Sequence, residues 1–160
     1  LNFSVIGNML GRKRGFCLWG MMTGWYFFWV LSRVSAHLKL SRGVRYLVHT
    51  ALFLLFCAVT TPYLPEELPF KAFLHIVFAM AAALCLCLYL FLAAWRLRKE
   101  DRTAGLVTLW CLAGILLVSA VLLILVGIVS SALEIFFTFS TVFLSRYFYG
   151  RTKRLISQSP

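Results

Sequence analysis

The sequence has few charged residues, and acidic ones are especially scarce: five Asp and Glu stand against sixteen Lys and Arg in 160 residues. Hydrophobic residues make up 62% of the chain, and the mean hydropathy is +0.89. A water-soluble fold of this length has too much surface to hide so many apolar side chains, so its boundary must face lipid. The composition therefore excludes a disordered chain, a disulfide-stapled secreted domain and a classical water-soluble enzyme.

Motifs for common chemistry are also lacking. The chain has no phosphate-cradling Gly-rich loop, nucleophile elbow, paired metal-ligand motif or cofactor fingerprint. It shows no internal repeat, and no secretory signal is recognisable at its start. These absences predict a protein without a cofactor, a bound metal or a catalytic set, and they favour a non-enzymatic role.

Long apolar regions predict membrane spans, each needing about 20 residues to cross roughly 30 Å of hydrocarbon. The region from Gly105 to Leu144 is about twice too long for one helix at about 1.5 Å per residue, so we predict a tight turn over Gly127–Ser131. Runs such as Met80–Leu84 do not alternate apolar and polar residues, which favours helices over a β-barrel. The sequence thus predicts an all-α polytopic transmembrane bundle with spans at about 16–32, 46–61, 70–95, 105–126 and 132–149, preceded by a pre-helix segment with a basic turn (1–15) and followed by a basic tail (150–160).

The basic residues lie between the apolar runs rather than along one face, which argues against a nucleic-acid partner. The segments Arg33–Arg45 and Arg96–Arg102 and the C-terminal end hold most of them. The positive-inside tendency therefore predicts that these segments and the C-terminus lie on the cytoplasmic or equivalent side. The cluster Arg12-Lys13-Arg14 is an exception, which a leading helix before the first span would explain.

Five cysteines invite a metal or redox interpretation, and Cys85 with Cys87 is the tempting pair. Residues two positions apart on a helix are rotated by about 200° around its axis, so the two sulfur atoms point to nearly opposite faces. We expect all five cysteines to act as small reduced hydrophobic side chains.

Three of the ionisable residues inside the predicted spans stand out as candidates, because burying such a group in a membrane is costly and usually marks a function. They are His49, His75 and Glu134. The topology places His75 and Glu134 at similar depth near the outer side, and Thr60, Thr61, Tyr63 or Glu66 could join them from the outer loop. The pair could serve acid–base chemistry, proton movement or headgroup binding, or it could simply hold helices together by a hydrogen bond. It offers too few ligands for a metal site.

Gly20 and Gly24 form a small-xxx-small pattern in the first span. Without side chains they would let a second helix approach closely, either within the bundle or from another subunit. The pattern predicts a packing face without naming the partner.

The start of the chain resembles the segment that leads into the second helix of FRAG/DRAM/Sfk-type membrane proteins and related bacterial six-helix proteins. The resemblance lies in the opening segment Phe3–Asn8, the basic turn and the Gly20/Gly24 helix. The Pro62–Pro69 loop followed by His75, and Glu134 at the head of the last helix, are similar to the same group. The resemblance implies a sixth, leading helix before this chain. It also implies a lipid-facing role: lipid remodelling, lipid sensing or support of a membrane complex.

Two functional hypotheses follow. The first is a non-catalytic scaffold or accessory subunit that packs against membrane lipids and other membrane proteins. The second is a lipid-handling protein that uses a His75/Glu134 polar site near the outer leaflet. A transporter is disfavoured because transporters place broken helices and polar groups at the membrane midplane, whereas the polar groups here lie near the boundaries.

Overall fold

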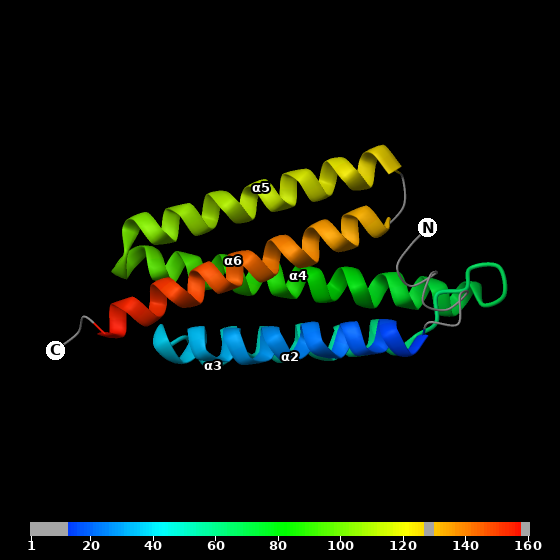
Figure 1. The fold of residues 1–160 in the computed structure, drawn as a ribbon, viewed down its shortest axis with the longest axis horizontal. Coiled ribbons are helices and arrows are strands. Elements are labelled where there is room, and N and C mark those ends of the chain that lie inside the picture. Colours follow the sequence, from blue (N-terminus) through cyan, green and yellow to red (C-terminus); the bar gives the residue numbers. More distant parts are fainter. Residues whose placement is uncertain (1–12, 127–129, 158–160) are drawn as a thin grey trace.

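The computed structural model describes residues 13–126 and 130–157, and this part of the chain is all α-helical. The prediction of an all-α chain is confirmed for these residues. The helices run antiparallel along one long axis (Figure 1). They are α2 (Lys13–His37), α3 (Arg42–Thr60), α4 (Pro69–Glu100), α5 (Arg102–Val126) and α6 (Ser131–Ser157).

Three of these helices, α3, α4 and α5, are long and apolar enough to cross a membrane by length and composition. This agrees with membrane association. Helices α2 and α6 are not among them. Helix α6 falls short because its apolar stretch between Glu134 and Arg146 is brief. Helix α2 falls short because it is rich in Trp, Tyr and Gly, which have low hydropathy.

Helix ends are set by local caps. Ser41 Oγ accepts a hydrogen bond from Val44 N at 3.4 Å at the start of α3, and Asp101 Oδ1 accepts one from Ala104 N at 2.9 Å at the start of α5. The expected loop Arg96–Arg102 is helical except at Asp101, and α6 continues through most of the expected tail. Charged ends can remain helical because a capped helix does not have to stop where its apolar stretch stops. The predicted turn over Gly127–Ser131 lies mostly outside the described residues; α5 ends at Val126, just before it, and α6 begins at Ser131, its last residue.

The five helices form a closed ring of neighbours. Each helix packs against the next along the chain, and α2 also packs against α6, which closes the ring. The end of the bundle that holds the α2–α3 and α4–α5 connections and the C-terminal end of α6 carries the basic segments (Figure 1). We call it the basic end. From there α5 diverges from α4 toward the opposite end (Figure 1).

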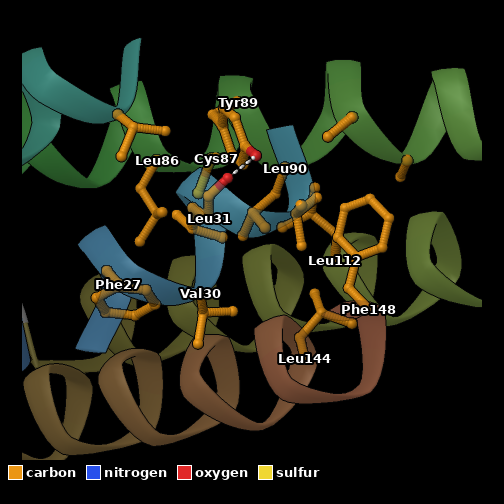
Figure 2. Close-up of a cluster of buried hydrophobic side chains, with 14 of the residues drawn as sticks. Phe27, Val30, Leu31, Leu86, Cys87, Tyr89, Leu90, Leu112, Leu144 and Phe148 are labelled. Carbon is orange, nitrogen blue, oxygen red and sulfur yellow. Dashed lines mark hydrogen bonds between the residues drawn. The ribbon is translucent and has the colours of Figure 1, made fainter. Parts of the chain in front are cut away.

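The tightest core lies toward the basic end and is built on the second half of α4. Tyr89, Leu90 and Leu97 of this helix are fully buried, against Leu31 of α2 and Phe148 of α6 (Figure 2). Helices with large residues facing inward at this level leave little empty space between them.

The buried hydroxyl of Tyr89 joins α4 to α2. It donates a hydrogen bond to the Leu31 carbonyl oxygen at 2.9 Å (Figure 2). Its single proton is then used, so Ser35 Oγ, also 2.9 Å away, donates to the Tyr89 oxygen. Both polar groups are satisfied inside an apolar core, as burial requires.

Helices α4 and α5 meet most closely at Gly105. A Cβ atom at this position would collide with the backbone of Arg98. Only glycine permits this approach, and it follows directly from the one-residue connection at Asp101.

The outward surface is strongly apolar. Trp110, Ile124 and Leu125 of α5 are each more than three-quarters exposed. Such a surface is unfavourable in water and is favourable against acyl chains.

We expect Gly105→Ala to lower the free energy of unfolding by about 1–3 kcal/mol, because the neighbouring backbone must move to admit a methyl group. Gly114→Ala on the same helix is the matched control: a Cβ there meets nothing within 4 Å, so the change should be neutral or stabilising by up to about 1 kcal/mol. Denaturant unfolding in detergent, followed by circular dichroism, measures both. Equal stability of the two variants would contradict the close approach of α4 and α5.

Candidate functional site

A cavity of about 560 Å³ lies between the helices, toward the end opposite the basic end. All five helices line it, mostly with aliphatic and aromatic side chains. Representative lining residues are Gly20 of α2, Val59 of α3, His75 and Ala82 of α4, Leu123 of α5 and Glu134 of α6.

The cavity exists because small residues face it. Ala79, Ala82 and Ala83 of α4 line the cavity together with Ala58 of α3 and Ala120 of α5. The same face of α4 carries large buried residues nearer the basic end. Alanine methyl groups cannot fill the space that widens between the helices, so a void remains.

His75 is buried near the start of α4 and is hydrogen-bonded to the C-terminal end of α3. Its Nδ1 lies 2.8 Å from the Ala58 carbonyl oxygen and 3.0 Å from that of Thr61. A carbonyl oxygen can only accept, so Nδ1 carries a proton and shares it between the two. The imidazole thereby donates to two carbonyl groups at the end of α3, of which that of Ala58 also accepts from Thr61 N at 3.2 Å.

Thr61 and Tyr63 gather around this histidine. Thr61 is the C-cap residue of α3, and its Oγ1 donates to the Cys57 carbonyl oxygen at 2.7 Å. The Tyr63 ring centroid lies 5.5 Å from that of His75. Thr60 is exposed and bonds within its own helix, to Phe56, and Glu66 is exposed in the loop.

Glu134 reaches the same cavity from another helix. It lies in the first turn of α6, where the positive end of the helix dipole favours a carboxylate. Glu134 and His75 both line the cavity. A direct contact between the imidazole and the carboxylate stays a prediction.

Sequence reasoning missed four serine and threonine residues of the cavity wall: Thr23, Ser119, Thr138 and Thr141. Ser119 Oγ is buried and has no hydrogen-bond partner among the described residues. Its signal in the sequence is weak, a single serine within the apolar run of α5. An unpaired buried hydroxyl is costly, but Ser145 Oγ, which does not line the cavity, is unpaired in the same way, so this feature does not by itself indicate a ligand.

The glycine pair of α2 faces α3. A Cβ on Gly20 would stand 2.6 Å from Val59 Cγ2, whereas one on Gly24 would meet Leu52 and Leu55 at an ordinary 3.9 Å. Within the bundle, Gly20 is therefore the position where the two helices approach closely.

The other candidates lie away from the cavity or supply no ligand set. His49 is exposed, and its Nδ1 donates to the Arg45 carbonyl oxygen at 3.0 Å. The five cysteines are free thiols. Within residues 13–126 and 130–157, no group of three His, Cys, Asp or Glu side chains could hold a metal ion.

Comparisons of the chain with protein-family models, with curated proteins and with solved structures find no match. The arguments for function therefore rest on the geometry of this chain.

We expect His75→Phe to lower the free energy of unfolding by about 1–3 kcal/mol, since it removes the buried donor that bonds the Ala58 and Thr61 carbonyl groups. His75→Gln keeps an N–H donor and should recover part of the loss. His49→Phe, at an exposed position, serves as the control. Thermal unfolding in detergent measures all three, and a His75→Phe protein as stable as the wild type would contradict the bond from α4 to α3.

Proposed function

We propose that the chain is an integral membrane protein whose five helices all cross the bilayer, and that it binds one lipid in the cavity between them. The hydrocarbon part of the lipid would lie against the alanine-lined wall. Its polar part would face His75 and Glu134, near the outer leaflet. The basic end would lie on the cytoplasmic or equivalent side, as the positive-inside tendency suggests.

Two features support the crossing of α2 and α6. Helices of 25 and 27 residues are about 38–40 Å long at about 1.5 Å per residue, which exceeds the roughly 30 Å hydrocarbon core. They also close the ring with α3 and α5, whose composition suits a membrane. The stretch Gly15–Ser32 of α2 has no charged residue. Arg146 of α6 lies near the basic end, where its long side chain can extend to the interface.

The cavity carries the argument for lipid binding. Its volume of about 560 Å³ falls within the range of about 300–1,000 Å³ typical of small-molecule sites. Such sites combine apolar walls with a few polar groups that orient the ligand. The placement of His75 and Glu134 in a wall that is otherwise mostly apolar is the single observation that points most directly to an amphiphilic ligand.

Binding is better supported than conversion. The Nδ1 proton of His75 is engaged by the end of α3, so this nitrogen holds structure rather than transferring a proton. Among the described residues of the cavity wall, no hydrogen bond joins a cysteine or a serine to a histidine in the way that activates a nucleophile.

The accessory-subunit hypothesis rests on the exposed apolar surface, above all that of α5. Acyl chains would cover the same surface equally well, so it favours neither hypothesis. The cavity supports only the lipid-handling hypothesis.

We expect the protein purified in mild detergent to retain about one lipid per chain, detectable by native mass spectrometry. Ala82→Phe and Ala79→Phe would each place a ring in the cavity and should reduce retained lipid about tenfold or more, since overpacking costs roughly 1–3 kcal/mol. Ala113→Phe on the exposed face of α5 is the matched control and should retain lipid as the wild type does.

A stoichiometric protein partner with no retained lipid would refute the proposal and favour the accessory role. Equal retention by the cavity variants and the control would place the lipid outside the cavity. Circular dichroism of each variant shows whether the bundle still folds, so loss of lipid can be separated from loss of structure.

A further inference from the structure

A second pocket, of about 650 Å³, lies between α2 and α6 at the basic end. We propose that it binds the phosphate group of an anionic phospholipid, whose acyl chains lie along the seam between these two helices. Its lining residues are Tyr26, Trp29, Val30, Arg146, Tyr149, Gly150, Lys153, Arg154 and Ser157. None of them lines the lipid cavity described above, so the two sites can be tested separately.

The pocket is strongly cationic. Arg146, Lys153 and Arg154 all line it, and no acidic residue does. The chain has five acidic residues in total. Two that lie at this end are already engaged: Glu100 pairs with Arg96 at 3.1 Å, and Asp101 caps α5. Guanidinium and ammonium groups bind phosphate by charge-assisted hydrogen bonds, which are the strong ones.

His37 lies beside the pocket and close to two cations. His37 stacks on Tyr149 with ring centroids 5.7 Å apart. Burial, together with the charges of Arg33 and Lys153, holds the pKa of His37 below its ordinary value. Burial is the largest cause of this lowering, and the two cations add to it.

The same flank supplies a path for acyl chains. On α6, Phe143 and Phe139 precede Arg146 by one and two turns on the same face, and they are 70% and 46% exposed. On α2, Met22 precedes Tyr26 by one turn and is 65% exposed. Further along, the rings of Trp19 and Phe139 meet across the seam with centroids 5.7 Å apart; these two residues also line the cavity between the helices, so only the headgroup pocket is separate from it. Charge at the membrane boundary above an exposed apolar seam is the arrangement that suits a phospholipid and not a soluble anion.

Aromatic residues mark the depth of the pocket. Trp29 and Tyr149 lie against each other with centroids 5.5 Å apart, and Tyr26 donates to the Val142 carbonyl oxygen at 3.1 Å. Amphipathic rings of this kind gather at the level of the headgroups. Basic pockets between transmembrane helices at that level are known to hold anionic headgroups.

The test measures lipid selectivity in nanodiscs that contain phosphatidylglycerol and phosphatidylcholine in equal amounts. Native mass spectrometry of the released protein should show phosphatidylglycerol bound in preference by about tenfold, because the choline ammonium is repelled by the pocket. A triple glutamine variant of the pocket should lose this preference. A charge-matched control replaces three exposed basic residues of the same end outside the pocket and should keep it. The pocket variant is Arg146→Gln/Lys153→Gln/Arg154→Gln, and the control is Arg42→Gln/Arg45→Gln/Lys99→Gln.

A second variant fills the pocket without changing its charge. A Cβ on Gly150 meets nothing within 4 Å, so Gly150→Phe should fold and should occupy the space of the headgroup. We expect it to lose the preference as the triple variant does, while lipid retained in the separate cavity is unchanged. If the charge-matched control also lost its preference for phosphatidylglycerol, general surface charge would explain the preference, and the proposal would be overturned. Displacement of phosphatidylglycerol by millimolar inorganic phosphate would assign the pocket to a soluble anion and overturn the lipid assignment.

Discussion

The close contact of α4 and α5 at Gly105 is the constraint on which the rest of the bundle depends. One residue, Asp101, reverses the chain between two long helices, so their axes must approach until the backbone of Arg98 touches Gly105. The helices diverge from that point (Figure 1). Tyr89 holds α2 to α4 on the near side, where large side chains fill the core. Farther along, alanines face a space that they cannot fill, and the cavity opens there.

The two ends of the bundle consequently offer different chemistry. At the hollow end the walls are apolar and the polar groups are few, and most of them are already engaged in holding helices, as His75 holds α3. At the packed end there is no room inside, and the polar chemistry lies on the flank, where arginine and lysine side chains line a pocket together with three aromatic residues. In the account proposed here, the bundle holds one lipid within it and a second, anionic lipid on its surface.

Hydropathy and helix breakers sufficed to predict an all-α chain, and each predicted span overlaps one of the described helices. They could not predict how the helices are rotated against one another. Helix α5 is apolar on nearly every side, so its sequence does not distinguish the face with Gly105 from the face with Trp110. The hydrogen bonds of His75 go to backbone carbonyl groups, which no side-chain pattern reveals. Ser119 and the basic pocket likewise depend on which helices become neighbours in space.

The most direct test of the central claim is whether an acyl chain enters the bundle. Ala58 and Ala82 line the cavity and are almost fully buried, while Ala93 and Ala94 lie in the packed core with no exposed surface. Methyl NMR of the protein in lipid bicelles can detect nuclear Overhauser effects between each alanine methyl group and acyl-chain methylenes. The account predicts such effects at Ala58 and Ala82 and none at Ala93 and Ala94. If acyl-chain contacts were found only at exposed residues, and neither Ala58 nor Ala82 showed one, the proposed lipid binding in the cavity would be contradicted.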